Sequence, residues 1–181
     1  MRNCRELTGI LGLAAAASLL LGPAVQAGEH NFVLTAYSNG RGGLALLSGD
    51  YDSAGKALSH KLALSAFDSS TNSNNLCVSL TVTKQWDAAR IACDRAVKDA
   101  EREKTGLAAF DAHTRGLEND CVAVALSNRA VLHWMTDESE AAAADLQRAA
   151  GLSPKSAFIR RNESALEYSR SALARADIAS Q

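Results

Sequence analysis

The chain has few prolines and few aromatic residues. Only two of its 181 residues are proline, Pro23 and Pro154, and 5% are aromatic. Proline breaks helices, whereas alanine, which is abundant here, is the best helix former. Small side chains also let two helices pack closely together. We therefore predict an all-α fold, and a chain of this length can bury the core of one ordinary domain.

An excess of charge of one sign is also missing. The sequence contains 19 basic and 20 acidic side chains, which gives a net charge of −1. A nucleic-acid-binding protein needs a basic patch or stripe to neutralise phosphates, and none is visible in this sequence. We therefore expect no nucleic acid among its partners.

The sequence contains no familiar catalytic or metal-binding motif. GxSxG, HExxH and a glycine-rich phosphate loop followed by lysine are all absent. None of the four histidines lies three or four residues from another histidine or cysteine, the spacing at which a helix presents two metal ligands. We therefore expect no enzyme activity, no cofactor and no metal. The competing class is a redox protein with a reactive Cys121, which would need a base near that thiol.

The one pronounced apolar run, Ile10–Leu21, is about a dozen residues long, too short to span a bilayer comfortably. Arg2 and Arg5 precede it, and small residues ending at Ala27 follow it. This pattern is typical of a secretory signal peptide over residues 1–27, in a bacterial style. We expect a soluble periplasmic protein with no membrane attachment after cleavage; a retained anchor is the alternative.

Residues 128–154, NRAVLHWMTDESEAAAADLQRAAGLSP, predict two short helices joined by a polar turn. Apolar residues recur at helical spacing on both sides of residues 136–139. Gly151 ends the second helix, and Pro154 sits where it can only begin the next one. Two amphipathic helices this short cannot bury their apolar faces on each other alone, so we expect further copies of the pair.

Two degenerate copies precede this pair, and together the three resemble the tetratricopeptide repeat (TPR) family. The family pattern is W-x2-L-G-x2-Y, then A-x3-F-x2-A, then P. The third copy matches it at Leu126, Arg129, Ala130, His133, Ala142, Leu146, Ala149 and Pro154. The second matches at Ser73, Leu76, Cys77, Leu80, Ala89, Cys93 and Ala96, and the first at Arg41, Gly42, Ala45, Ala54 and Leu58.

The spacing between copies supports the resemblance. The small residues Gly42, Cys77, Ala130 and Ser164 are 35, 53 and 34 residues apart. Two of these distances fit a 34-residue repeat, and the middle one requires an insertion at about residues 104–119. An unrelated alanine-rich helical bundle is the alternative.

The resemblance implies an α-solenoid of about three TPR-like helix hairpins with a C-terminal capping helix. The domain would cover residues 35–176 after a short lead-in at 28–34. Its hairpins would lie at about 35–68, 70–103 and 123–154, with the capping helix at 155–176.

Two segments are harder to assign. Residues 28–37 show no reliable periodicity. The first helix would run from Tyr37 to Ser48, or from nearer Arg41 because glycines weaken its start. Leu76–Thr83 alternates like a strand, but the repeat register predicts a helix there.

Cys77 and Cys93 occupy facing slots on the two helices of the second repeat. An oxidising compartment permits a disulfide between them, with Cys121 left free. Cys93–Cys121 is the rival pairing, and three small buried thiols without any bond are the third possibility.

The resemblance also implies a function. In TPR proteins the first helices of the hairpins line a concave groove that binds an extended peptide or a partner helix, often through asparagines. The matching positions here are Asn75, Asn128 and Asn162, with Arg161 able to meet a carboxylate and Trp134 making the groove partly apolar. Asparagines that cap helices or tie adjacent repeats together are the alternative. We therefore expect a protein–protein interaction module with an unidentified protein or peptide partner; a homo-oligomer that self-associates through its terminal helices is the competing function.

Overall fold

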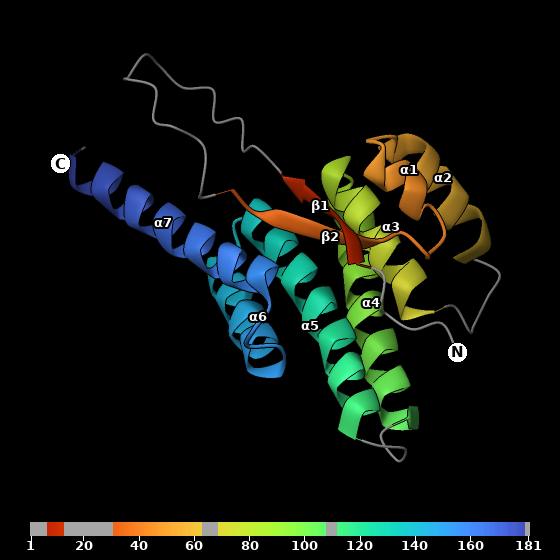
Figure 1. Ribbon diagram of the computed structural model, residues 1–181. Helices are drawn as coiled ribbons and strands as arrows, with labels where there is room; N and C mark the ends of the chain where they lie inside the picture. Colours follow the sequence, from red (N-terminus) through yellow and green to blue (C-terminus); the bar gives the residue numbers. More distant parts are fainter. Residues whose placement is uncertain (1–6, 13–30, 63–68, 108–111, 180–181) are drawn as a thin grey trace.

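The computed structural model describes residues 7–12, 31–62, 69–107 and 112–179. Most of the predicted signal peptide, the end of the first predicted hairpin at 63–68 and part of the insertion, 108–111, lie outside these residues. The described chain is mostly helical, which confirms the predicted fold class in its coarse form (Figure 1). The helices are α1 (Gly43–Leu47), α2 (Tyr51–Leu62), α3 (Ser70–Val82), α4 (Trp86–Leu107), α5 (Ala112–Met135), α6 (Ser139–Leu152) and α7 (Ala157–Ala179).

Two short strands accompany the helices: β1 (Leu7–Gly12) and β2 (Val33–Tyr37). They pair antiparallel, with Leu11 opposite Leu34 and Gly12 opposite Val33. Helices α3, α5 and α7 all contact β2, so the strand crosses three helices that are far apart in the sequence (Figure 1).

Three predicted boundaries are wrong. The chain from Val33 to Tyr37 is a strand instead of an irregular lead-in that enters a helix, and α1 starts only at Gly43. A turn precedes α1, and it needs glycine at two positions. At Gly40 and Gly43 the backbone lies too close to neighbouring backbone and side chains for any larger residue. Helix α4 continues through the expected break at Thr105-Gly106, and α5 starts five residues before Leu117. The insertion thus lengthens two helices. Leu76–Val82 lies in α3, so the helix prediction there is confirmed.

The loops α1–α2, α3–α4 and α5–α6 share one backbone geometry. Each has a central residue in the left-handed region, namely Gly49 (φ 80°), Lys84 (φ 57°) and Asp137 (φ 63°). The residue after it donates its N–H to the carbonyl five residues earlier, the pattern of a Schellman helix end, in the pairs Asp50–Ala45, Gln85–Leu80 and Glu138–His133. Each next helix then buries an alanine at the same position: Ala54, Ala89 and Ala142. The turns are separated by the same 35 and 53 residues as the small residues of the sequence pattern.

The core follows the helix pairs. One cluster gathers the apolar residues of β2 with α5, α6 and α7, and includes Leu34, Val131, Leu146 and Leu166. A second lies between α4, α5 and the start of α7, and a third between α2, α3, α4 and α5. None of the described helices is long and apolar enough to cross a membrane.

A disulfide joins Cys77 of α3 to Cys93 of α4, as the repeat pattern predicted. Both residues are fully buried, and the Thr81 hydroxyl lies 3.9 Å from the Cys93 sulfur. No cysteine among the described residues is free, so our expectation of a free thiol at Cys121 is wrong. In the chain-entropy model, a disulfide that closes a loop of about 15 residues adds about 3 kcal/mol to the free energy of unfolding.

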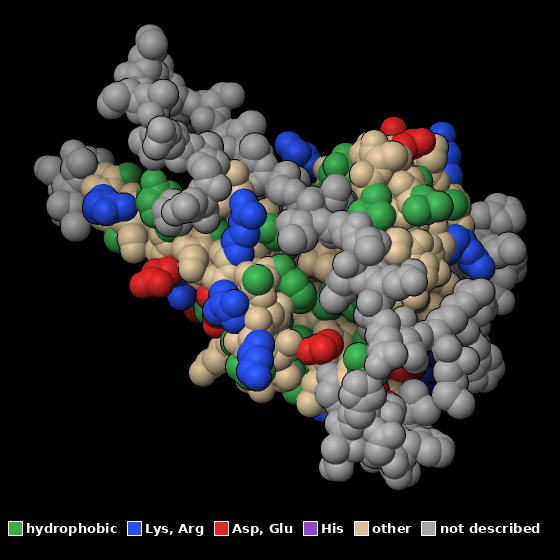
Figure 2. Space-filling view, in the orientation of Figure 1, with side chains coloured by type: hydrophobic (Ala, Val, Ile, Leu, Met, Phe, Trp, Pro, Cys, Tyr) green, Lys and Arg blue, Asp and Glu red, His purple; other side chains and the backbone are tan. Residues whose placement is uncertain are grey.

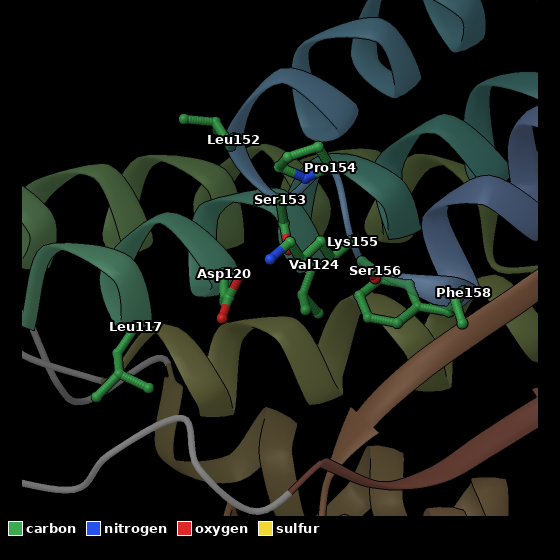
Figure 3. A pocket seen from close by; sticks show the side chains of 10 residues that line it. Leu117, Asp120, Val124, Leu152, Ser153, Pro154, Lys155, Ser156 and Phe158 are labelled. Atoms are coloured by element: carbon green, nitrogen blue, oxygen red, sulfur yellow. The ribbon is translucent and has the colours of Figure 1, made fainter. Parts of the chain in front are cut away.

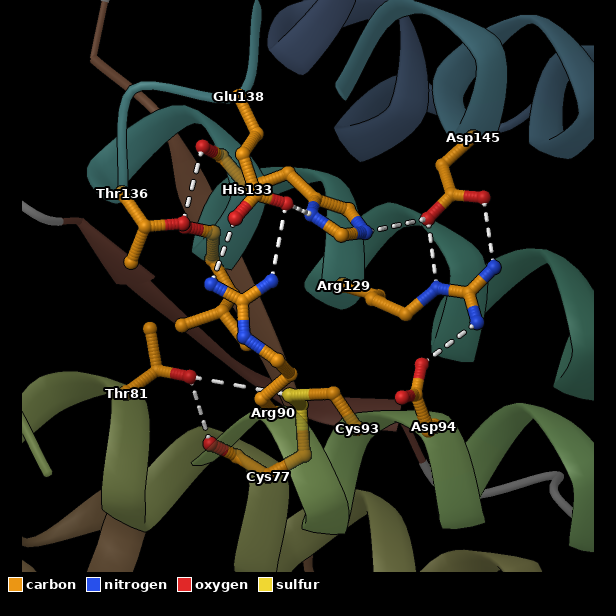
Figure 4. Close-up of polar contacts among 11 residues, drawn as sticks. Cys77, Thr81, Arg90, Cys93, Asp94, Arg129, His133, Thr136, Glu138 and Asp145 are labelled. Carbon is orange, nitrogen blue, oxygen red and sulfur yellow. Dashed lines mark hydrogen bonds and ion pairs between the residues drawn. A yellow bond between two sulfur atoms is a disulfide. The ribbon is translucent and has the colours of Figure 1, made fainter. Parts of the chain in front are cut away.

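Charged side chains connect α4 to the α5–α6 hairpin (Figure 4). Arg90 bonds to Glu138 at 2.6 Å, and Glu138 also accepts a hydrogen bond at 2.6 Å from Nδ1 of His133. Arg129 donates to both oxygens of Asp145, at 2.7 and 2.8 Å, and to Asp94 on α4 at 2.9 Å. These contacts fix α4 relative to the α5–α6 hairpin. His133, which matches a usually aromatic position of the predicted pattern, belongs to this network.

Candidate binding site: an asparagine ladder along β2

Strand β2 is completely enclosed. All five of its residues are buried, with Val33, Leu34 and Ala36 at 0% exposure. A buried strand must find partners for its backbone N–H and C=O groups, because leaving them unpaired away from water costs free energy. One edge of β2 pairs with β1, and asparagine side chains serve the other.

Three asparagines each hold one residue of the strand by both of its backbone groups. Asn162 Oδ1 accepts the N–H of Val33 at 2.7 Å, and its Nδ2 donates to the Val33 carbonyl at 2.9 Å. Asn128 makes the same two bonds with Thr35, both at 2.8 Å. Asn75 makes them with Tyr37, again both at 2.8 Å. A side-chain amide both donates and accepts, so it pairs with a peptide unit as a neighbouring strand would.

The ladder has the spacing that the sequence pattern predicts. Asn75, Asn128 and Asn162 occupy one position in α3, α5 and α7, 53 and 34 residues apart. In an extended strand every second residue directs its backbone groups to the same edge. One step from repeat to repeat therefore corresponds to two residues of strand, from Tyr37 through Thr35 to Val33. Because the bonds involve backbone only, this edge does not depend on the side chains of the strand.

Further polar side chains complete the ladder. Asn74 donates to the Thr35 carbonyl at 2.9 Å and accepts from Asn128 at 2.8 Å, while Ser127 accepts from Asn162 at 2.9 Å. Asn72 accepts the N–H of Arg41 at 2.7 Å. The sequence singled out neither Asn72 nor Ser127. Residues 68–73 read as a polar linker of capping residues, and that prediction is wrong because α3 begins at Ser70. The signal was the run of asparagines and serines from Asn72 to Asn75, which is too polar for an ordinary core helix.

Two acidic residues of α4 anchor the start of α3 beneath the strand. Glu103 accepts from the N–H and the hydroxyl of Ser70, at 2.8 and 2.6 Å. Asp99 accepts from the hydroxyl of Ser73 at 2.6 Å. These bonds explain how a helix start rich in Ser and Asn can be buried: its polar groups have partners.

Tyr37 ends the ladder in an unusual setting. Burial raises the pKa of its phenol, and the negative charges of Asp120 and Glu103 raise it further. Among the residues that the structure describes, its hydroxyl has no hydrogen-bond partner, and neither does the hydroxyl of Thr35. The site therefore keeps Tyr37 neutral.

The two other predicted groove residues lie differently. The ring of Trp134 stacks on Phe32, with centroids 5.7 Å apart, so this aromatic contacts the chain's own N-terminal segment. Arg161 is half-buried on α7, and its Nε has no hydrogen-bond partner. A carboxylate contact for Arg161 and contact of the asparagines with a partner's backbone stay predictions; the backbone that Asn75, Asn128 and Asn162 hold here is the chain's own.

An open hollow of about 750 Å³ lies between α5 and the α6–α7 turn (Figure 3). Leu117, Asp120 and Val124 line it from α5, and Pro154, Lys155 and Phe158 line it from the other side. The hydroxyl of Ser156 is buried there without a partner.

Over the described residues, no group of three His, Cys, Asp or Glu side chains is arranged to hold a metal. No family model matches the sequence, and neither the curated proteins nor the solved structures include a significant match.

Proposed function

We propose that this protein is a non-catalytic protein–protein interaction module of the bacterial envelope, built from TPR-like hairpins, that binds an extended segment of a partner. One observation carries the proposal: an asparagine from each of α3, α5 and α7 holds both backbone groups of alternate residues in an extended chain. Such a ladder recognises extended backbone whatever its sequence, which is the chemistry of peptide binding.

The TPR-like arrangement is supported by the repeated turns at Gly49, Lys84 and Asp137 and by the alanine that each following helix buries. Helix α7 covers the last hairpin, as the terminal helix of a solenoid does. The envelope location rests on the signal peptide that the sequence predicts, and the Cys77–Cys93 disulfide is compatible with an oxidising compartment.

In this function β2 stays in the ladder when the partner binds. Displacing it would expose Phe32, Leu34, Ala36 and Tyr37, all of which are buried. Exposure of that much apolar side chain costs about 1.5–3 kcal/mol for each large residue, so a partner gains little by competing with the strand. We therefore propose that the asparagines hold β2 in place and that the partner binds without displacing it.

The test is a pull-down from envelope extract of the source organism with identification of the captured proteins. The variant Asn128→Ala with Asn162→Ala releases β2, and Gln147→Ala, at an exposed position of α6, is the matched control. Partners should be captured by the wild type and the control and lost with the double variant. Circular dichroism must show that the double variant keeps its helices. Equal capture by all three proteins would contradict the proposal.

Self-association is the second candidate, and the end of α7 favours it. This helix extends beyond α6 in Figure 1, and Tyr168 and Leu173 on it are 38% and 59% exposed. Light scattering coupled to size exclusion separates the two functions: a stable oligomer that Leu173→Asp dissociates would support self-association, whereas a monomer would exclude it.

A further inference from the structure

Cys121 of α5 forms a disulfide whose partner lies outside the described residues. No described cysteine is free, and Cys121 is bonded. Cys77 and Cys93 are bonded to each other. The chain has four cysteines, so the one left for Cys121 is Cys4. That residue comes three positions before Leu7, where β1 begins.

The described strands bring this end of the chain towards α5. Leu7 lies opposite Tyr37 at the end of β2. Burial raises the pKa of the Tyr37 phenol, and the negative charge of Asp120 raises it further, so Asp120 lies within electrostatic range of the ring. Asp120 immediately precedes Cys121. Three residues of extended chain span about 10–11 Å, which allows Cys4 to reach this part of α5.

We propose that a Cys4–Cys121 disulfide fastens the N-terminal segment to α5, and that residues 1–27 stay in the folded protein with β1 as the lasting neighbour of β2. Forming the bond removes two electrons and two protons from the two thiols, and an oxidising protein or small-molecule disulfide takes them up by exchange. The proposal takes the place of the expected cleavage after Ala27, which would detach β1 together with Cys4. The segment can still direct export, because only its removal is set aside. This inference does not depend on the proposed peptide-binding function.

A covalent hold on β1 keeps the outer edge of β2 covered. The backbone groups of Leu34 and Ala36 face away from the asparagine ladder, because successive residues of a strand alternate, and Leu11 of β1 lies opposite Leu34. Beside this edge, α1 contacts both strands and leaves Leu44 74% exposed. Figure 2 shows hydrophobic side chains at the surface over α1 and α2. Without β1, an open strand edge beside apolar surface would favour aggregation.

The pairing of β1 with β2 has reason to need such a bond. Strand β1 is six residues long, and its register is irregular between Leu7 and Ile10. A single pair of short strands is only marginally stable in water. Cys4 and Cys121 are 121 − 4 = 117 residues apart. A disulfide stabilises a fold by restricting the unfolded chain, and its effect grows with the length of the loop that it closes.

The test is a peptide map of the full chain, exported in a bacterial host and purified without reductant. Free thiols are blocked with N-ethylmaleimide before digestion with trypsin. The proposal predicts a linked pair of peptides, residues 3–5 and 116–129, that separates on reduction. The Cys77–Cys93 bond, measured in the same digest, is the internal control.

Two results of the map would overturn the proposal. A chain that begins at Gly28 would show that the N-terminal segment is removed. A Cys121 that carries the blocking group, or that is linked to the same residue of a second copy, would show that the bond is not made. The pull-down does not measure either property, so failure of this proposal is distinguishable from failure of the proposed function.

Serine variants measure what the bond does for the fold. Cys4→Ser and Cys121→Ser should each lower the thermal midpoint by roughly 5–15 °C, because each opens the same long loop. The variant that carries both changes should match the single variants, since all three lack one bond. A midpoint of Cys4→Ser equal to that of the wild type would overturn the proposal.

Discussion

At the scale of single residues, a side-chain amide does the work of a neighbouring strand. Each ladder asparagine replaces two backbone hydrogen bonds with two of its own, at 2.7 to 2.9 Å. Its neighbours hold it in place: Asn128 also donates to Asn74, and Asn162 to Ser127. The amide is thus bonded on both sides, which fixes its orientation without a charge.

Substitution of the central rung should destabilise the fold. Asn128→Ala leaves the buried N–H of Thr35 without an acceptor, whereas the Thr35 carbonyl keeps its bond from Asn74. We expect a loss of about 1–3 kcal/mol in the free energy of unfolding, measured by urea denaturation. The exposed control Gln147→Ala should change it by less than about 0.5 kcal/mol. A loss no larger than that of the control would contradict the ladder.

Tyr37→Phe tests the buried phenol. The variant removes a hydroxyl that has no partner, so the unfolding free energy should rise by about 1 kcal/mol at pH 7. In the wild type the folded-state pKa is raised by burial first, so stability is fully present below the ordinary pKa of 10.0 and falls as the pH rises above it. The alkaline loss should be smaller in Tyr37→Phe than in Tyr51→Phe. Identical alkaline profiles would show that Tyr37 ionises freely in the folded protein.

At the scale of elements, the helices and the strand differ in how far the sequence reveals them. Helices α3 to α7 follow from local periodicity and from the repeat register, and even the strand-like Leu76–Val82 was predicted correctly as helix. Strand β2 was missed because all five residues are buried, so no alternation marks it. Its backbone partners Asn75 and Asn162 are 38 and 129 residues away, a distance that no local pattern encodes.

For the candidate site, too, the sequence reveals the residues that share the repeat register but not their distant partner. The repeat register aligns Asn75, Asn128 and Asn162, and the resemblance suggests that they contact backbone. Which backbone they contact depends on the path of residues 31–41, which the glycine turn before α1 directs. The turn depends on tertiary contacts. Gly40 and Gly43 lie so close to Asn75 and to the Tyr37 carbonyl that a side chain would not fit, and no helix pattern in the sequence reveals this.

The turn itself can be tested. A Cβ at Gly43 would overlap the carbonyl oxygen of Tyr37 and crowd that of Ser38, so Gly43→Ala must displace the end of β2. We expect a loss of about 1–3 kcal/mol in the free energy of unfolding by urea denaturation. Gly151→Ala is the control, because nothing lies within 4 Å of its added methyl, and it should stabilise α6 by about 0.5–1 kcal/mol. Equal effects of the two alanines would mean that the turn is not tightly packed.

At the scale of the whole molecule, the hairpins are held together by charge as well as by the core. The ion pairs of Arg90 with Glu138 and of Arg129 with Asp94 join α4 to the α5–α6 hairpin. Arg90 donates a hydrogen bond to Glu138, and His133 bonds it too, which lowers the pKa of that carboxyl to about 2 from its ordinary 4.5. Lowering the pKa in the folded state links this contact to stability at acid pH.

The lowered pKa of Glu138 determines how stability changes with pH. The stabilisation by ionised Glu138 is present above its ordinary pKa of 4.5 and is lost as the pH falls from there towards about 2. Glu138→Gln should therefore lose less stability than the wild type between these pH values, as measured by thermal unfolding across that range. Glu140→Gln, at a nearby exposed position, should follow the wild-type profile. If the stability of Glu138→Gln depended on pH as that of the wild type does, the Glu138 contacts would not contribute to stability.

Amide hydrogen exchange at Val33, Thr35 and Tyr37, followed by NMR in the wild type and in Asn128→Ala, shows directly whether the asparagines hold this strand. We expect the wild-type amides to be protected nearly as well as those of α5, and Asn128→Ala to lose protection along the strand while the helices keep theirs. Wild-type exchange at the rate of an unstructured peptide, or unchanged protection in Asn128→Ala, would contradict the claim that asparagines hold this strand.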